Sequence, residues 1–586
     1  MRGEAVTDDT VLAELPNVAR PRLQLAKAIR RYWGELAVVG IALLVWLPRL
    51  SGPIDLRWDG GVYYLLGTSL AQGHGYRIPS EPGSPEALQY PPLLPAIVAI
   101  YQRALGTADP TIVAPLLRKS YAGLFVVYGL VVLALARRYL RPEWAVVATA
   151  LCLLHVMTIF LSDLLFAELP FALVSVVFVL VAGNGRVGKG PWLREAASFA
   201  LAAAGFLLRT AGLALLGAWV LEAIVRRRWG LAVSRAALAL LPVIAWQAHV
   251  ARVRGSYEYA HPAYEYQRAP YQYYNVSYAE NLRLVDPFRP ELGYLSPVAL
   301  VGRVMENVPS MLVAVGETVT TRKGYWLQLL DRPQKRLFGQ LLIPENVVFV
   351  PLLMFAALAM FGLIVLVRRR AWLIGFVVLG SLGLTCTTPW PAQFTRYLMG
   401  LAPFLAIGAV LGVSQIRAAL PDRKVGLGSI LGRTALTGLV ILVFIAQAFA
   451  ALKMFRQRWS SHAGSFVTGA NQAGSRLFFH DRTWQAWEES AAWVSAHASP
   501  DAIVATSAPH FFYLCTGVRA VLPPMEPDPE RAERLLNDVP TSYVIVDQLE
   551  FVDLSRRYVR PAMENDPARW RLVKTFNDTK VYARAR

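Results

Sequence analysis

The sequence is poor in cysteine and lacks a nucleotide-binding loop. It contains three cysteines, Cys152, Cys386 and Cys515, in 586 residues. Neither their number nor their spacing suits a disulfide framework or a structural zinc site. No glycine-rich stretch ends in Lys followed by Ser or Thr, the pattern that holds nucleotide phosphates. The sequence therefore excludes a disulfide-rich or zinc-ribbon protein and argues against an ATP-driven transporter.

Charge is also scarce, because only 17% of the residues are charged while 55% are hydrophobic. Such a chain is too apolar for an ordinary soluble protein and indicates several membrane spans. The net charge of +19 comes from Lys and Arg clustered at the ends of apolar runs. Basic residues there orient helices and contact anionic lipid headgroups. The predicted partner of this charge is the lipid bilayer, with no nucleic acid.

Basic clusters also predict the topology. Arg20, Arg22, Lys27, Arg30 and Arg31 precede the first apolar span, which places the segment 1–35 in the cytoplasm by the positive-inside rule. We expect that span to be a retained anchor in the inner or plasma membrane. About eleven transmembrane helices follow from the apolar runs: 36–47, 122–136, 145–161, 169–182, 197–208, 211–224, 231–250, 346–367, 371–384, 397–413 and 431–451.

Polar regions between and after these spans are expected on the extracytoplasmic side. They are two loops, 51–112 and 251–344, and a C-terminal domain, 453–586. The apolar stretches 62–71, 93–105 and 298–319 predict helices that lie at the membrane interface. For the C-terminal domain the pattern predicts helices at 484–496 and 528–537 and strands at 502–506, 518–522, 542–546, 570–575 and 581–583. The predicted fold is an all-α polytopic membrane core over 36–452 with interfacial helices in its outer loops, followed by a small extracytoplasmic α/β domain.

Charged residues at the outer ends of predicted spans are the candidates for chemistry. They are Asp59, the pair Asp163 and Glu168, Arg209, and Arg396. Asp163 and Glu168 are five residues apart, so on one helix they would point about 140° away from each other. We therefore favour Glu168 as the one that faces a shared cavity.

This combination suits a reaction on a lipid-linked phosphate. Arginines hold a phosphate with charge-assisted forked hydrogen bonds, which predicts donor-phosphate binding by Arg209 and Arg396. A carboxylate can take the proton of an incoming hydroxyl, which predicts Asp59 as the general base. Because a phosphate leaving group already carries negative charge, cationic side chains can stabilise it without a strong general acid.

Several motifs resemble those of the type C glycosyltransferases, integral-membrane enzymes that include protein O-mannosyltransferases and aminoarabinose transferases. In this sequence they are Trp58-Asp59 with Tyr63 and Tyr64, Gly73-His74-Gly75-Tyr76, Tyr90-Pro91-Pro92, Phe166-Ala167-Glu168-Leu169-Pro170, Leu208-Arg209-Thr210-Ala211-Gly212, and Arg396-Tyr397-Leu398. The resemblance implies a helical membrane core, a catalytic carboxylate at Asp59, and a polyprenyl-phosphate-linked sugar donor. It also implies a lipid, glycan or protein acceptor that approaches from the extracytoplasmic face.

The predicted substrate-binding residues are Arg57, Tyr63, Tyr90, Asp163 and Glu168. We expect no obligatory cofactor and no metal ligands. Because some members of the resembled superfamily need a divalent cation, Mg²⁺ or Mn²⁺ held by Asp59 with Asp163 or Glu168 stays open as an alternative.

Other interpretations also stay open. The chain could be a polytopic transporter or lipid flippase, or a membrane-anchored binding protein that acts through its C-terminal domain. Asp59 could cap the helix that follows it. The tyrosines at 257–278 could stack on sugars or lipid isoprenes, although an aromatic belt at the membrane interface is the favoured interpretation.

Overall fold

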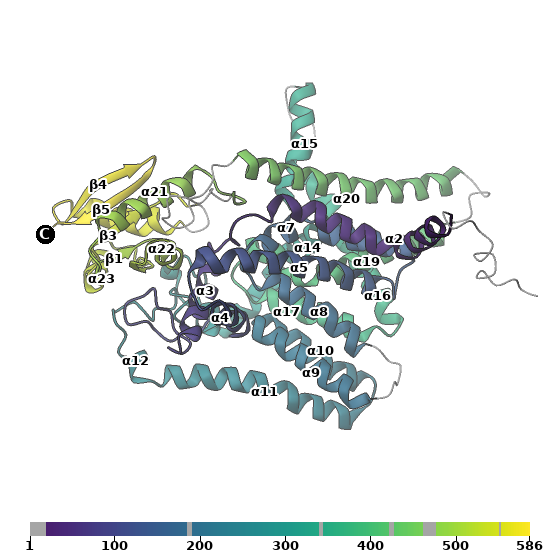
Figure 1. The fold of residues 1–586 in the computed structure, drawn as a ribbon, viewed down its shortest axis with the longest axis horizontal. Coiled ribbons are helices and arrows are strands. Elements are labelled where there is room, and N and C mark those ends of the chain that lie inside the picture. The colour runs from purple at the N-terminus through teal and green to yellow at the C-terminus, as the bar shows by residue number, and fades with distance from the viewer. Residues whose placement is uncertain are drawn as a thin grey trace, which may run out of the picture.

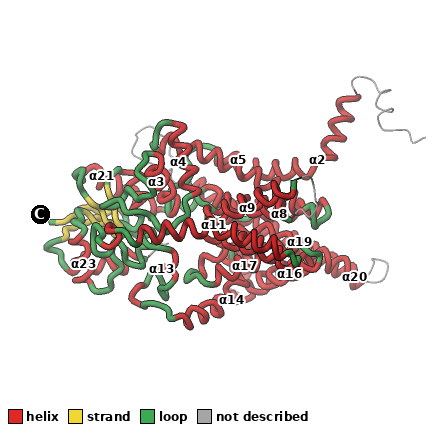
Figure 2. Tube along the Cα trace, turned by 90° about the horizontal axis from the view of Figure 1, so that it is seen from below, coloured by secondary structure: helices red, strands yellow, loops and turns green. Residues whose placement is uncertain are grey.

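The computed structural model describes residues 19–183, 190–338, 344–420, 427–460, 476–549 and 553–585. Most of the predicted cytoplasmic segment, 1–18, lies outside these residues. Figure 1 shows a bundle of long helices, with one helix that projects from its side and a small sheet at one end. Figure 2 shows that all the strands gather at the end of the molecule that holds the C-terminus. The predicted fold class, a helical core with a small α/β domain, is confirmed.

The helical core carries seven helical segments that are long and apolar enough to cross a membrane, counted over the described residues. Their bounds are Arg30–Arg49, Pro110–Ala136, Trp229–Arg254, Pro297–Val319, Glu345–Arg368, Pro391–Ala419 and Ile430–Ser460. A bent pair, α6 (Pro142–Leu154) and α7 (Val156–Asp163), makes an eighth if it forms one span. Four shorter apolar helical segments complete the set: Leu93–Leu105, Glu168–Ala182, Thr210–Val225 and Trp372–Cys386. The chain is therefore a multi-pass membrane protein.

The helices of this core are, in chain order, α2 (Ala19–Trp46), α5 (Pro110–Ala136), α6, α7, α8 (Glu168–Ala182), α9 (Pro191–Leu208), α10 (Leu213–Val225), α11 (Trp229–Arg254), α14 (Pro297–Val319), α16 (Phe349–Arg368), α17 (Trp372–Cys386), α18 (Phe394–Leu398), α19 (Ala402–Ala419) and α20 (Leu427–Ser460). Short 3-10 helices, Leu47–Arg49, Thr210–Gly212, Glu345–Val348, Pro391–Gln393 and Met399–Leu401, lie at several of their ends. Each of the eleven predicted spans falls on a helix of this core, but α9, which holds the span predicted at 197–208, is not among the apolar segments given above.

Two predictions about the core need correction. The stretch 298–319, predicted as an interfacial helix, is the 23-residue helix α14, which meets the length and composition of a membrane span. It packs closely on α16, because a Cβ at Gly316 would lie 2.1 Å from the carbonyl oxygen of Leu352. The span predicted at 122–136 begins at Pro110, where Asp109 caps α5 by accepting from the Thr111 backbone N–H. Arg118 interrupts the apolar run, yet its side chain is fully buried.

The loop 51–112 contains the two predicted interfacial helices, α3 (Asp59–Ala71) and α4 (Leu93–Leu105). They pack so closely that a Cβ at Gly67 would lie 2.7 Å from the side chain of Val98. The loop 251–344 adds short helices and one longer one: α12 (Tyr257–Ala260), α13 (Tyr278–Leu282), a 3-10 turn at Pro290–Leu292, and α15 (Lys323–Phe338).

The C-terminal domain is a five-stranded sheet with helices. Its strands are β1 (Ile503–Ala505), β2 (Arg519–Val521), β3 (Tyr543–Val546), β4 (Trp570–Phe576) and β5 (Thr579–Arg584), in the order β2-β1-β3-β5-β4. β1 pairs in parallel with β2 and with β3, where Val504 lies opposite Tyr543. β5 pairs antiparallel with β3, where Tyr543 lies opposite Ala583, and also antiparallel with β4. Its helices are α21 (Arg482–His497), α22 (Pro509–Thr516), α23 (Pro529–Asp538), a π-helix at Ser555–Val559 and α24 (Arg560–Asn565). All five predicted strands and both predicted helices are confirmed, whereas α22 and the helices at 555–565 were not predicted.

The C-terminal domain is packed onto the rest of the chain. One continuous buried cluster joins residues of the helical core, such as Phe404, to Trp487 and Ile545 of the C-terminal domain. A second buried cluster joins Tyr264 and Tyr266 of the second loop to the sheet. The loop 51–112, the first part of the loop 251–344 and the C-terminal domain therefore pack together at one end of the bundle.

Candidate active site

Asp59 is the first residue of α3, and the backbone just before it is strained. Trp58 has φ 54° and ψ −131°, a left-handed conformation that costs a non-glycine residue about 1–3 kcal/mol. The indole of Trp58 packs edge-on against Phe160 of α7 and Trp484 of α21, with ring centres 5.9 and 5.7 Å away. These two contacts hold the turn that places Asp59.

The carboxylate of Asp59 is engaged by two side chains from distant parts of the chain. Oδ1 accepts a hydrogen bond of 2.9 Å from the Tyr90 hydroxyl, and Oδ2 pairs with Arg396. Trp58 occupies the capping position of α3, and among the described residues no side-chain capping bond forms there. The alternative that Asp59 serves as a helix cap is therefore not what the structure shows.

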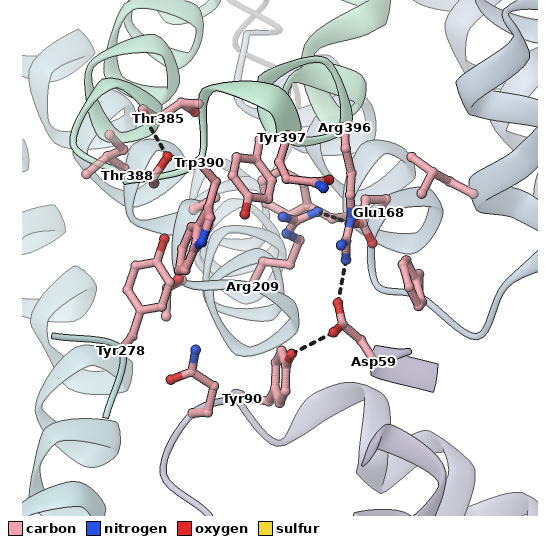
Figure 3. Close-up of a pocket in the computed structure, with 18 of the residues that line it drawn as sticks. Asp59, Tyr90, Glu168, Arg209, Tyr278, Thr385, Thr388, Trp390, Arg396 and Tyr397 are labelled. Atoms are coloured by element: carbon pink, nitrogen blue, oxygen red, sulfur yellow. Dashed lines mark hydrogen bonds and ion pairs between the residues drawn. The ribbon is translucent and has the colours of Figure 1, made fainter. Parts of the chain in front are cut away.

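Glu168 links Asp59 to Arg209 through Arg396. Glu168 Oε1 lies 2.7 Å from Arg396 Nε and 2.9 Å from Arg209 Nη1. Glu168 is almost fully buried, whereas the side chains of Asp59, Arg209 and Arg396 keep 17%, 18% and 22% of their exposure. Four residues that are distant in sequence thus form one network of two negative and two positive charges, shown in Figure 3.

Local sequence places the two arginines. Arg209 has an extended backbone between α9 and the following 3-10 turn. That turn is tight, because a Cβ at Gly212 would lie 2.3 Å from the backbone of Gly205. Arg396 lies on α18 after a turn rich in proline, and its guanidinium stacks over the Phe166 ring at 4.4 Å.

The network lies in the wall of a cavity of about 590 Å³. Residues from the loops 51–112 and 251–344, α7, α8, the turn at 209–211 and the segment 381–401 line it. The residues from these two loops are Trp58, Asp59, Tyr63, Gln89, Tyr90, Pro91, Tyr273, Tyr274, Tyr278, Asn281, Leu282, Phe288 and Arg322. The others include Met157, Phe160, Glu168, Phe171, Arg209, Ser381, Thr385, Thr388, Trp390, Arg396 and Tyr397.

Of the predicted substrate-binding residues, Tyr63, Tyr90 and Glu168 line this cavity. The Tyr63 and Tyr90 rings pack with centres 4.8 Å apart. Burial, and then the nearby charge of Asp59, raise the pKa of Tyr90 well above its usual value. Tyr90 therefore stays protonated and can donate to Asp59 at any physiological pH.

The prediction that Arg57 contacts substrate needs correction, because its side chain is fully buried outside the cavity lining. Its guanidinium pairs with Asp55 at 2.7 Å and donates to the carbonyl oxygens of Phe478 and Phe479 at 2.6 and 3.2 Å. It also lies over the Trp58 and Trp484 rings. Arg57 thus ties the Asp59 turn to the first described residues of the C-terminal domain.

Asp163 also lies outside the cavity lining. It is buried and pairs with Arg118 at 2.8 Å and with Arg49 at 3.4 Å. The sequence could not reveal this partnership, because Arg118 comes 45 residues before Asp163 and reaches it only through the packing of α5 on α7.

The cavity also contains residues that the sequence did not assign to a site. Tyr273, Tyr274 and Tyr278 line it, although the tyrosine-rich stretch was interpreted mainly as an aromatic belt. Tyr274 packs edge-on against His510 of α22 at 4.7 Å. Trp390 was not singled out at all. The density of tyrosines was the only signal, and it did not show which rings face inward.

A divalent cation does not fit this arrangement. Mg²⁺ and similar cations take several oxygen ligands, but the Arg396 guanidinium lies between the carboxylates of Asp59 and Glu168. Over the part of the chain that the structure describes, no group of three or more His, Cys, Asp or Glu residues could hold a metal. We assign no step to a metal, and the expectation that none is obligatory stays a prediction.

No family model matches the sequence, and no curated protein matches it. The structure is similar to several solved structures. One is the archaeal oligosaccharyltransferase AglB from Archaeoglobus fulgidus in complex with an inhibitory peptide and a dolichol-phosphate, at 11% identity and TM-score 0.48, over 88% of this chain and 69% of that chain. Another is ArnT from Cupriavidus metallidurans, at 13% identity and TM-score 0.47 in the apo state, over 94% of this chain and 97% of that chain. ArnT bound to undecaprenyl phosphate matches at 12% identity and TM-score 0.45 with the same coverage.

Proposed function

We propose that this protein is a membrane glycosyltransferase that moves a sugar from a polyprenyl-phosphate donor to an acceptor at the extracytoplasmic face. One observation carries the proposal: Asp59, Arg209 and Arg396 line one cavity, and Arg396 binds Asp59 directly. A base beside two phosphate-binding cations is the minimum that such a transfer needs.

In the proposed reaction the acceptor hydroxyl attacks the anomeric carbon of the donor sugar. A bond forms between the acceptor oxygen and that carbon, while the bond between the carbon and the phosphate oxygen breaks. The phosphate leaves with the electron pair of the broken bond. Asp59 takes the proton of the acceptor hydroxyl, so that charge and atoms balance.

The ion pairs suggest how the donor would prepare the base. Without a donor, Arg396 neutralises Asp59 and Glu168 together, and Arg209 adds a second positive charge beside Glu168. A donor phosphate that binds the two arginines competes with Asp59 for Arg396. Oδ2 of Asp59 is then free to accept a proton, while the Tyr90 hydroxyl keeps Oδ1 in place.

The arginines would also stabilise the leaving group. The donor phosphate gains negative charge as the bond to the sugar breaks, so cations already fixed in place act most strongly at that moment. Arg209 and Arg396 are fixed by Glu168, which is nearly fully buried and cannot move to water without losing both partners.

The proposal is tested by mass spectrometry of lipid that copurifies with the full-length protein. We expect a polyprenyl phosphate, with or without a sugar. The double variant Arg209→Met with Arg396→Met should lose it. The exposed pair Arg252 and Arg254, changed to Met in the same way, should retain it.

Two outcomes would contradict the proposal. One is copurification of ordinary membrane phospholipids alone. The other is equal retention of polyprenyl phosphate by both double variants, since the cavity arginines would then not hold the phosphate.

A further inference from the structure

Part of the cavity lining is polar but uncharged. Figure 3 shows Tyr278 and Trp390 on the side away from Asp59, with Thr385 and Thr388 nearby and Arg209 between the two sides. Gln89, Asn281 and Ser381 line the same cavity. We call Gln89, Tyr278, Asn281, Ser381 and Trp390 the neutral wall.

Within the part of the chain that the structure describes, four buried polar atoms of the neutral wall have no hydrogen-bond partner. They are Gln89 Oε1, Asn281 Oδ1, Ser381 Oγ and Trp390 Nε1. The residues Gln89, Asn281 and Ser381 keep only 8%, 0% and 8% of their exposure. A buried polar atom without a partner costs about 1–3 kcal/mol. The four residues that carry these atoms all line the cavity, so a ligand there that reaches the atoms would supply the missing bonds.

The chemistry of these atoms matches hydroxyl groups. The two amide oxygens accept, the indole N–H donates, and the serine hydroxyl does both. The orientation of Asn281 is fixed, because its Nδ2 donates to the carbonyl oxygen of Pro270 at 3.0 Å. A sugar hydroxyl can donate and accept at once, and the faces of Trp390 and Tyr278 can pack against the C–H face of a sugar ring.

Charge decides what kind of sugar fits. Among the described lining residues the charged ones are Asp59, Glu168, Arg209, Arg322 and Arg396. Both carboxylates belong to the arginine network, and the neutral wall itself has no acidic or basic residue that could pair with a sugar ammonium or carboxylate group. Placing an ammonium against the neutral wall would leave a buried charge unpaired, which is costly.

We propose that the neutral wall binds the donor sugar, and that this sugar is uncharged and rich in hydroxyl groups, such as a neutral hexose. The inference rests on the proposed function, because it assigns the sugar part of the same donor whose phosphate meets Arg209 and Arg396. It narrows the substrate class, since it excludes amino sugars and uronic acids.

The test measures binding to the full-length protein in nanodiscs. The probes are short-chain polyprenyl phosphates that carry glucose, mannose, a 4-amino-pentose or glucuronic acid, together with sugar-free polyprenyl phosphate and phosphate-free polyprenol. We expect at least one of the two hexose donors to bind about tenfold or more tightly than either charged-sugar donor.

Variants distinguish binding of the donor sugar from binding of the donor phosphate. Trp390→Ala should weaken binding of the better hexose donor about tenfold and leave sugar-free polyprenyl phosphate within about twofold. Trp372→Ala, on α17 and outside the cavity lining, is the matched control and should change neither. Gln89→Leu is a second test variant. It should not destabilise the fold, because the acceptor that it removes has no partner, but it should weaken binding of the hexose donor.

Two results would overturn the inference alone: a charged-sugar donor that binds as tightly as both hexose donors, or variants that weaken sugar-free polyprenyl phosphate as much as the hexose donor. Preferred binding of glucuronic acid would assign Arg322 as its partner instead of the neutral wall. The proposed function fails with a different signature, in which polyprenyl phosphate binds no better than polyprenol. That result would overturn both.

Discussion

Arg57 makes a prediction about stability, because it joins the Asp59 turn to the C-terminal domain. We expect Arg57→Gln to weaken this junction strongly. The substitution removes the guanidinium that pairs with Asp55 and donates to the carbonyl oxygens of Phe478 and Phe479. Asp55 is 1% exposed, so its carboxylate would remain buried without its partner.

The magnitude follows from that burial. Removing one partner of a buried ion pair typically costs about 3–5 kcal/mol, which increases a local opening equilibrium about 150- to 5,000-fold. Arg77→Gln is the matched control. Arg77 pairs with Glu258 and Glu86, but its side chain is 29% exposed and that of Glu258 is 40% exposed. Pairs at the surface contribute about 0–1 kcal/mol.

Hydrogen exchange read by mass spectrometry measures the effect. Under conditions where exchange reports opening equilibria, Arg57→Gln should speed exchange in peptides that cover 55–64 and 476–480 by that factor, whereas Arg77→Gln should change them little. Arg57→Lys should fall between, since an ammonium can pair with Asp55 but lacks the fork that reaches both carbonyls. Equal exchange in Arg57→Gln and Arg77→Gln would refute the reasoning.

Two further predictions concern packing and pH. Gly212→Ala should destabilise the protein by about 1–3 kcal/mol, because the added Cβ forces the α9–α10 turn apart. Thermal unfolding measures this loss. Gly217→Ala is the control and should show no such loss, because its Cβ would meet nothing within 4 Å. Burial lowers the pKa of His510 from 6.5 to about 3. Below pH 6.5 the unfolded chain binds a proton that the folded chain does not, so this residue's contribution to stability falls as the pH drops from 6.5 towards 3. The loss of stability should reach about 2 kcal/mol at pH 5. The free energy of unfolding of His510→Gln, measured at pH 5 and pH 7.5, should lack this loss. If His510→Gln and the unchanged protein lose the same stability between these pH values, His510 is not its source.

Much of the fold could be predicted from the sequence, because apolar runs bounded by arginines specify membrane helices directly. The same reasoning misjudged α5 and α14. Arg118 interrupts the apolar run of α5, but its guanidinium forms a buried ion pair with Asp163. Only tertiary structure shows that such a residue belongs inside the bundle.

The candidate site was partly predictable for a similar reason. Asp59, Glu168, Arg209 and Arg396 were expected to share one pocket, and the structure places them in direct contact. Arg57 carries the same kind of signal, a charge near the end of a span, yet it pairs with Asp55 and donates to backbone carbonyls 421 and 422 residues away. Nothing in the local sequence distinguishes the two cases.

The neutral wall could not be predicted at all. Tyr278, Asn281, Ser381 and Trp390 come from segments about 100 residues apart, and none of them is charged. Their significance depends on unpartnered atoms that meet at one cavity, which only the packed structure reveals.

The most direct test of the central claim is the turnover of Asp59→Asn, measured beside its affinity for the donor. The assay follows release of polyprenyl phosphate from a sugar-bearing donor by the full-length protein in isolated native membranes, which supply the acceptor, with the exposed Asp501→Asn as control. If Asp59 is the base, turnover should fall about 10²- to 10⁴-fold while donor affinity stays within a few-fold and Asp501→Asn behaves as the unchanged protein. Near-normal turnover by Asp59→Asn would contradict the account.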